Sequence, residues 1–223
     1  MLVYHGSTQL VSVPLYGAGK VHNDYGPGFY CTQELEMAKE WACPEERDGF
    51  ANEYRLDTEG LTCLNLNQRP YHILNWLAIL VENRVFDSSY PIMVQGKRYL
   101  WDHFLPDYRQ YDLITGYRAD DSYFAFARDF LLNTITLEQL SRAMRLGLLG
   151  TQIVIKTERA FDAIQKVQTH VAPGNIYHPK RVVRDRRARE DYLKILSEDA
   201  LPSGVYMNDI IKQQWQNEDP RIP

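Results

Sequence analysis

The amino-acid sequence predicts a mixed α+β fold in one globular domain that carries a C-terminal extension. Short runs such as 29–31 and 50–56 have the length and composition of strands, whereas residues 70–85 carry an apolar helical face. The chain of 223 residues is 44% hydrophobic and 12% aromatic, which suffices for one packed core. A chain that holds both kinds of element fits a sheet covered by helices.

Six short segments are predicted as strands, and Gly-rich or polar stretches separate them. In chain order they are residues 2–4, 29–31, 50–56, 61–64, 113–116 and 152–156. The mixed, Gly-rich stretch 5–25 is expected to be a loop, and the Gly26-Pro27-Gly28 tripeptide a turn into the second strand. Residues 160–167 fit either a helix or an extended segment.

Helices are predicted where apolar residues recur on one face. The first follows Thr32 and places Leu35, Ala38, Trp41 and Ala42 on one side, and the others are residues 70–85, 120–132, 137–146, 184–196 and 209–215. Thr32 and Thr136 are the expected N-caps of two of these helices, because a hydroxyl accepts a hydrogen bond from a free N–H of the first turn.

A break near residue 173 divides the chain into a domain of residues 1–172 and a charged helical extension of residues 173–223. Pro173-Gly174 and Pro179 mark this break. The extension carries a run of basic residues: Lys180, Arg181, Arg184, Arg186, Arg187 and Arg189. A solvated helix whose basic residues pair with neighbouring acids is the favoured interpretation. A patch for nucleic acid or an acidic partner is the alternative.

Charge, cysteine usage and hydropathy bound the class of protein further. The formal net charge of −4 gives no reason to expect an anionic membrane or nucleic acid as partner. The three cysteines lack CxxC spacing and the histidines lack metal-ligand spacing, so no metal is expected. Reduced thiols and the lack of a visible leader predict a cytoplasmic location, with secretion without a cleaved signal left open. The apolar run 73–81 is too short to span a bilayer, so no membrane partner is expected.

Several short motifs combine a hydrogen-bonding His, Gly-rich backbone and aromatic rings. Near the N-terminus they are Tyr4-His5-Gly6-Ser7, Gly26-Pro27-Gly28-Phe29-Tyr30-Cys31-Thr32 and Ala38-Lys39-Glu40-Trp41-Ala42. Further along they are Tyr111-Asp112-Leu113-Ile114-Thr115-Gly116, Ala119-Asp120-Asp121 and the segment from Gln152 to Phe161. Their order and spacing are more specific than any one of them.

Together these motifs resemble those of the ADP-ribosyltransferase superfamily, in the diphtheria-toxin and poly-ADP-ribose-polymerase-like branch with its His-Tyr-Glu triad. The similarity is closer to a bacterial domain family of unknown function within that superfamily, and it covers roughly residues 2–167. The resemblance implies a split antiparallel β-sandwich with peripheral helices, in which NAD lies in the cleft between two small sheets. We expect the stretches 8–25 and 87–106 to line the side on which the acceptor binds.

The resemblance implies which residues bind NAD. They are His5, Gly6, Ser7, Gly28, Tyr30, Thr32 and Trp41. His5 would hydrogen-bond a ribose hydroxyl of the adenosine half, and the Gly6 backbone would meet the nicotinamide carboxamide. Tyr30 and Trp41 would stack on the cationic nicotinamide ring, each contributing on the order of 1–2 kcal/mol.

Gln152 occupies the third triad position, where the superfamily usually has Glu. Gln keeps the hydrogen bond to the nicotinamide ribose but lacks the charge that stabilises the oxocarbenium-like ribose. Superfamily members with a substituted third residue typically transfer one ADP-ribose unit, so the resemblance implies a mono-transferase. Asp120 and Asp121 are the candidate acids for the missing charge, and capping of the following helix is the alternative role for them.

The predicted catalytic residues are therefore His5, Tyr30 and Gln152 with Asp120 and Asp121. The expected function is mono-ADP-ribosyl transfer from NAD to a macromolecular acceptor, protein or nucleic acid, with release of nicotinamide. The resemblance indicates a bacterial toxin, effector or toxin–antitoxin component, for which an antitoxin or immunity protein is an expected partner. The alternatives are an NAD glycohydrolase and an inactive module that binds NAD or a partner.

Overall fold

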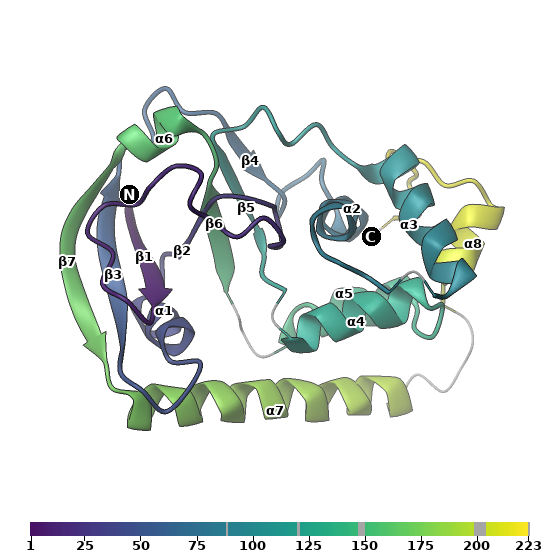
Figure 1. The fold of residues 1–223 in the computed structure, drawn as a ribbon. Coiled ribbons are helices and arrows are strands. Elements are labelled where there is room, and N and C mark those ends of the chain that lie inside the picture. The colour runs from purple at the N-terminus through teal and green to yellow at the C-terminus, as the bar shows by residue number, and fades with distance from the viewer. Residues whose placement is uncertain (88, 120, 147–149, 199–203, 223) are drawn as a thin grey trace.

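The computed structural model describes residues 1–87, 89–119, 121–146, 150–198 and 204–222 (Figure 1). The strands in this part of the chain are β1 (Leu2–Ser7), β2 (Phe29–Thr32), β3 (Gly49–Leu56), β4 (Cys63–Asn65), β5 (Leu113–Tyr117), β6 (Thr151–Ile155) and β7 (Ile164–Ala172). The helices are α1 (Leu35–Ala42), α2 (Ile73–Asn83), α3 (Pro91–Phe104), α4 (Asp121–Leu131), α5 (Leu137–Ala143), α6 (Glu158–Asp162), α7 (Gly174–Glu198) and α8 (Met207–Lys212). The predicted α+β class is confirmed.

The strands form one mostly antiparallel sheet in the order β4-β5-β6-β2-β1-β3-β7. Only β4 and β5 run parallel among the neighbouring strands described. The pairing between β1 and β2 is short and has a single register pair, Tyr4 with Thr32, whereas β1 pairs with β3 along its whole length. Most helices lie beside the β4-β5-β6 half of the sheet, and α1 lies against the other half (Figure 1).

The two faces of the sheet contribute to two different apolar clusters, as the alternation of side chains along a strand requires. Ile114 of β5 and Val154 of β6 join the larger cluster, which helices α2, α3, α4, α5 and α8 complete. Ile153 and Ile155 of β6 join the smaller cluster, with Phe29 and others. The apolar run of α2 is buried in the larger cluster, so its hydrophobicity serves the core.

Close packing of α1 on β1 depends on Gly6. A Cβ atom at this position would lie 2.1 Å from the Ala38 carbonyl oxygen and 2.8 Å from the Cβ of Trp41. Both neighbours belong to α1, and the carbonyl is backbone that cannot rotate away. A glycine therefore lets the helix approach the strand closely enough to hold Trp41 beside it.

Several predicted boundaries are wrong. β1 continues to Ser7, so the predicted loop begins at Thr8, and helix α3 was missed because its mixed polar sequence lacks a clear apolar face. Thr32 belongs to β2 and is not the N-cap of α1; its hydroxyl accepts a hydrogen bond from the Glu34 N–H at 3.2 Å, one residue before the helix begins. Thr136 does cap α5, and it accepts a hydrogen bond from the Gln139 N–H.

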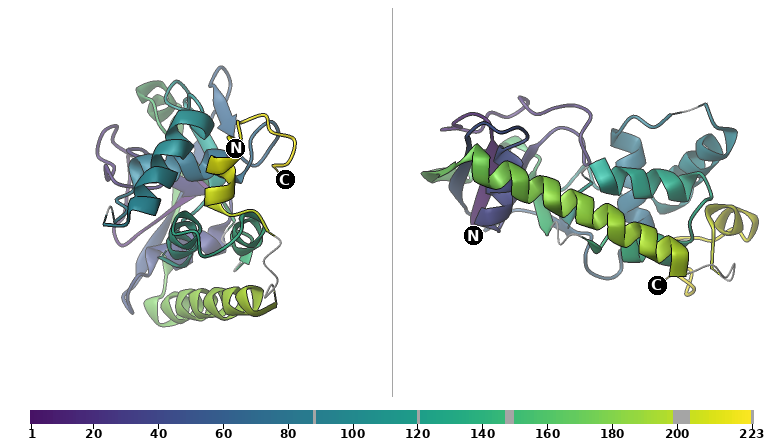
Figure 2. Two further views of the ribbon diagram at one scale, coloured as in Figure 1. Left: turned by 90° about the vertical axis from the view of Figure 1, so that its right-hand side faces the viewer. Right: turned by 90° about the horizontal axis from the view of Figure 1, so that it is seen from below.

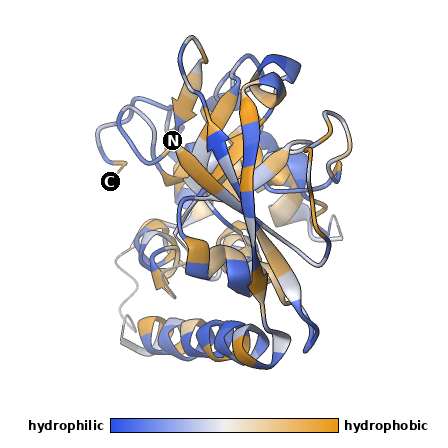
Figure 3. Ribbon diagram, turned by 90° about the vertical axis from the view of Figure 1, so that its left-hand side faces the viewer, coloured by the Kyte–Doolittle hydropathy of each residue, from blue (hydrophilic) through white to orange (hydrophobic). Residues whose placement is uncertain are grey.

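Helix α7 is longer than predicted and runs from Gly174 through Pro179. A proline this close to the helix start removes only one backbone hydrogen bond, that to the carbonyl four residues earlier. The helix passes beneath the sheet and beneath α4 and α5, and hydrophilic and hydrophobic residues interleave along it (Figures 2 and 3). Its ion pairs include Lys180–Glu36, Arg184–Glu40, Arg186–Glu190, Arg189–Asp185 and Lys194–Asp191. The pairing that favoured a solvated helix is thus present.

The C-terminal residues pack into the domain. Met207, Ile210 and Trp215 are buried and belong to the larger apolar cluster, together with Tyr192 of α7. The hydroxyl of Tyr192 also donates a hydrogen bond to the Asp129 carboxylate of α4 at 2.9 Å. The division of the chain at residue 173 stays a prediction, but the segment beyond it shares its core with the segment before it.

Asp112 at the start of β5 joins three segments of the chain. Its buried carboxylate accepts hydrogen bonds from the N–H and hydroxyl of Thr62 at 2.7 and 2.8 Å, from the Thr157 hydroxyl, and from Arg159. Asp112→Ala should lower the free energy of unfolding by about 2–4 kcal/mol, because these hydrogen bonds to a buried carboxylate are all lost. Chemical denaturation of this variant beside Asp107→Ala, an exposed position, measures the difference.

The stabilisation by Asp112 should depend on pH. The Arg159 guanidinium and the neighbouring hydroxyls hold the pKa of this carboxyl well below its usual range. A carboxyl with a depressed pKa in the folded state stabilises the fold above its unfolded pKa of about 3.9, and this contribution is lost as the pH falls below it. The stability gap between the parent and Asp112→Ala should therefore narrow below about pH 4; a gap that is equal at pH 3 and pH 7 would contradict this role.

Candidate active site

A pocket with a volume of about 880 Å³ opens where β1, β2 and β6 meet the loop between β1 and β2. This volume lies within the range of small-molecule sites. Among the residues that line it are six of the predicted NAD-binding residues and the third triad residue: His5, Gly6, Ser7, Gly28, Tyr30, Trp41 and Gln152. Strand neighbours that are far apart in sequence are therefore brought to one cavity by the sheet order.

The imidazole of His5 is oriented by the next strand. Its Nδ1 lies 2.8 Å from the Tyr30 carbonyl oxygen, and its ring stacks on Phe29 with 4.3 Å between the centroids. A carbonyl oxygen can only accept, so Nδ1 carries the proton and Nε2 keeps a free lone pair. Burial lowers the pKa of His5, which keeps the ring neutral near pH 7. Within the described residues Nε2 has no hydrogen-bond partner.

Tyr30 is held in place through its hydroxyl. This group donates to the Gly26 carbonyl at 2.5 Å and accepts from the Tyr25 N–H at 3.0 Å, so it ties β2 to the turn that precedes it. Burial raises the pKa of the phenol far above its usual value, which leaves the hydroxyl protonated. The half-buried ring lines the pocket.

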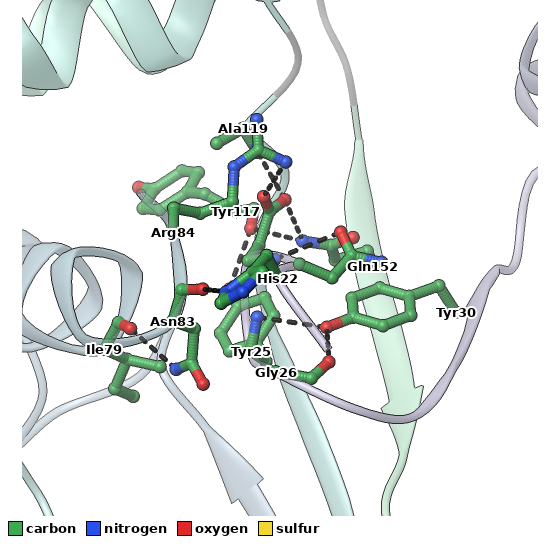
Figure 4. Close-up of polar contacts among 12 residues, drawn as sticks. His22, Tyr25, Gly26, Tyr30, Ile79, Asn83, Arg84, Tyr117, Ala119 and Gln152 are labelled. Carbon is green, nitrogen blue, oxygen red and sulfur yellow. Dashed lines mark hydrogen bonds and ion pairs between the residues drawn. The ribbon is translucent and has the colours of Figure 1, made fainter. Parts of the chain in front are cut away.

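Gln152 of β6 is the centre of a buried polar network (Figure 4). Its side-chain Nε2 donates to the Asp24 Oδ2 at 3.0 Å and to the Tyr117 carbonyl oxygen at 2.9 Å. The same Asp24 oxygen accepts from the Ala119 N–H at 2.9 Å, and its other oxygen lies 3.5 Å from Nη1 of Arg84. Burial raises the pKa of Asp24, while these hydrogen bonds and the two nearby arginines, Arg84 and Arg118, oppose that shift.

Trp41 projects from α1 into the pocket wall, and one face of its ring is covered. The guanidinium carbon of Arg118 lies 4.1 Å from the ring centroid, which is a close cation–π contact. The indole Nε1 is buried without a hydrogen-bond partner in the described part of the chain. A ligand ring that stacks on Trp41 must therefore use the face that Arg118 leaves open or displace this arginine.

The remaining predicted residues differ in their placement. Ser7 lies at the pocket, where its hydroxyl accepts a hydrogen bond from the Gln9 N–H at 3.1 Å. Gly28 also lines the pocket, and a Cβ there would meet Val154 at 2.7 Å. Thr32 is buried opposite Gln152 in the ladder, outside the pocket lining. Asp120 lies outside the described residues, and Asp121 is the first residue of α4.

Sequence reasoning did not predict five charged residues that line the pocket. They are Lys20, Asp24, Arg84, Arg118 and Arg181. One signal existed for Asp24, an acid just before the Gly26-Pro27-Gly28 turn. The arginines come from the end of α2, from the segment after β5 and from α7. Nothing in the local sequence marks Arg84 or Arg118, whereas Arg181 belongs to the basic run of the extension. Arg181 shows that the C-terminal helix contributes to the pocket.

The chain belongs to the DUF3990 family. The model of this family, described as a protein of unknown function (DUF3990), matches residues 1–166. The match includes β1 to β6 and every residue predicted for the site, and it ends before α7. No curated protein and no solved structure matches the chain significantly.

The described residues contain no group of three or more His, Cys, Asp or Glu side chains arranged to hold a metal ion. No helix in the described ranges is both long and apolar enough to cross a bilayer. Cys31, Cys43 and Cys63 are free thiols, the first two of them buried.

Proposed function

We propose that this chain is a mono-ADP-ribosyltransferase with the split β-sandwich fold of that superfamily, and that it uses NAD to modify a macromolecule. The observation that carries the proposal is the meeting of His5, Tyr30 and Gln152 in one pocket, on the adjacent strands β1, β2 and β6. The resemblance in sequence predicts that these three residues act together. The sheet order supports this, because β6, β2 and β1 are neighbours in the sheet and bring the three side chains to one pocket.

His5 would bind the adenosine ribose in this proposal. Its neutral ring presents the Nε2 lone pair, which accepts a hydrogen bond from a ribose hydroxyl. The Tyr30 carbonyl sets the tautomer that makes Nε2 the acceptor. Tyr30 itself offers an aromatic face, held by its own hydroxyl contacts, against which the cationic nicotinamide ring stacks.

The reaction breaks the bond between the nicotinamide nitrogen and C1′ of the ribose. The bonding electron pair leaves with nicotinamide and neutralises its ring, and positive charge develops on the ribose. A nucleophilic atom of the acceptor then attacks C1′ and gives up its proton. Gln152 would accept a hydrogen bond from the nicotinamide ribose and so orient it for attack.

The proposal has the acceptor approach over the stretches 8–25 and 87–106, as a protein or a nucleic acid. It also places the chain among cytoplasmic toxins, effectors or toxin–antitoxin components, with an antitoxin or immunity protein as its partner. The apolar side chains that the first stretch exposes support a macromolecular contact there: Leu10, Val13, Leu15, Tyr16 and Val21.

Incubation with NAD labelled on the adenine side tests the proposal. The purified protein is given the labelled NAD with host-cell lysate and, separately, in buffer. Label on a protein or nucleic-acid band is the expected result, and it names the class of acceptor. Free ADP-ribose in buffer alone would indicate an NAD glycohydrolase instead. Bound but unconsumed NAD in both arms would indicate an inactive binding module.

A further inference from the structure

The acid that accompanies Gln152 is Asp24, from the loop between β1 and β2. The residue is 3% exposed and lies at the wall of the pocket. The loop is anchored beside it, because Tyr25 is fully buried and its hydroxyl donates to the Tyr117 carbonyl oxygen at 2.7 Å. Lys156, the residue after β6, also donates to the carbonyls of Tyr25 and Pro27 at 2.5 and 2.6 Å. Asp24 is therefore fixed although it belongs to a loop.

The orientation of the Gln152 amide follows from its two hydrogen bonds. A side-chain amide has two N–H donors, and here both are directed at acceptors, Asp24 Oδ2 and the Tyr117 carbonyl. A flipped amide would point its oxygen at these two acceptors and lose both bonds. The carbonyl oxygen Oε1 is thereby directed away from them, and within the described residues it has no hydrogen-bond partner.

Hydrogen-bond donors and an arginine surround the Asp24 carboxylate. Oδ2 accepts hydrogen bonds from both Ala119 and Gln152, whereas Oδ1 is buried without a hydrogen-bond partner among the described residues and lies 3.5 Å from Nη1 of Arg84. Burial raises the pKa of Asp24, whereas these hydrogen bonds and the cations Arg84 and Arg118 oppose that shift and favour the ionised form. In its ionised form Asp24 holds a negative charge one hydrogen bond behind the amide that faces the pocket.

We propose that Asp24 is the positioning residue of this site, which locks the Gln152 amide with its carbonyl oxygen toward the pocket and supplies charge behind it. This inference rests on the proposed function. One Glu would both accept the ribose hydrogen bond and carry the charge; here two side chains share these tasks. Gln152 contacts the substrate, and Asp24 holds and polarises Gln152.

Gln152→Glu should impair this site, although it restores the residue usual in the superfamily. A carboxylate at this position has no N–H to donate, and it would face the Asp24 carboxylate and the Tyr117 carbonyl. Repulsion between like charges raises a carboxyl pKa and disturbs the geometry. Gln152→Glu should therefore lower the rate of nicotinamide release, and Asp24→Asn added to it should recover part of the loss, because the like charge is gone.

The experiment compares the full-length parent, Asp24→Asn, Gln152→Glu and the double variant, with Asp107→Asn as an exposed control. Nicotinamide release gives kcat and KM, calorimetry gives the affinity for NAD, and thermal unfolding reports the fold. Asp24→Asn keeps an oxygen that can accept from Gln152 but removes the charge, so it is expected to lower kcat on the order of 10- to 100-fold with little change in KM. If Asp24 had only a structural role, Asp24→Asn would lower the melting temperature without lowering kcat selectively over KM.

The outcomes separate the two levels of the proposal. Parental kcat and KM in Asp24→Asn would overturn the inference while the proposed function stands. If Asp24→Asn does not fold, the Gln152→Glu variant tests the inference in its place. Nicotinamide release by Gln152→Glu at a rate equal to or above that of the parent would overturn the inference. Effects that simply add in the double variant would also count against it. A parent that neither binds nor consumes NAD overturns the proposed function, and the inference with it.

Discussion

His5→Ala should lower the rate of nicotinamide release from NAD by about 100-fold or more, because the ribose loses the acceptor that orients it. Two contacts orient the ring so that Nε2 is the acceptor: Nδ1 donates a hydrogen bond to the Tyr30 carbonyl at 2.8 Å, and the ring stacks on Phe29. Loss of the ring also removes this stacking, so the melting temperature must be measured together with the rate.

His5→Asn separates the fold from the chemistry. Its amide N–H₂ can still donate to the Tyr30 carbonyl from the position of Nδ1, but it offers nothing at the position of Nε2. We expect this variant to keep the parental melting temperature more closely than His5→Ala and to lose the activity equally. His103→Ala, which changes a histidine of α3 outside the pocket, is the matched control. Activity that survives in His5→Asn would remove Nε2 from the mechanism.

The pH dependence of the same reaction gives a second check on His5. Burial lowers the pKa of this ring from its ordinary value of 6.5, so the neutral form dominates at and above pH 7. Protonation at lower pH would convert the acceptor Nε2 into a donor. The rate should therefore be constant across neutral pH with respect to His5 and fall only when the pH drops below 6.5. A rate that rises on acidification through this range would contradict the assigned tautomer.

Removal of residues 174–223 should unfold the domain. The deletion takes away Tyr192, Met207, Ile210 and Trp215 from the larger apolar cluster, and it removes helices α7 and α8, which pack against α3, α4 and α5. Each such side chain contributes roughly 1.5–3 kcal/mol through burial. Their sum approaches the whole stability of a typical domain, about 5–15 kcal/mol. Circular dichroism and thermal unfolding of the truncated chain measure the result.

Point variants show whether the loss comes from the core. Trp215→Ala should lower the free energy of unfolding by about 3–5 kcal/mol, because Trp215 is almost fully buried. Leu193→Ala, at a position of α7 that is 63% exposed, should change it by less than about 0.5 kcal/mol. A truncated chain that unfolds at the parental temperature would instead support an independent extension that begins near residue 173.

Much of the secondary structure could be predicted from local sequence patterns. The strands around His5 and Tyr30 were predictable because alternation and a Gly-rich turn are properties of adjacent residues. Thr136 was recognisable as a cap for the same reason. Helix α3 was not, because its polar residues and an internal glycine, Gly96, hide the apolar face that packs against the core. The run of charges in α7 likewise concealed the buried side of that helix.

The sequence by itself predicted the α+β class and seven residues that line the pocket: His5, Gly6, Ser7, Gly28, Tyr30, Trp41 and Gln152. Only the tertiary structure decided which acid stands beside Gln152. Asp24 and Gln152 are separated by 128 positions in the chain, and their hydrogen bond exists because Tyr25 is buried and pins the loop against β5 and β6. No local pattern encodes such a contact, since it depends on how the sheet brings distant segments together.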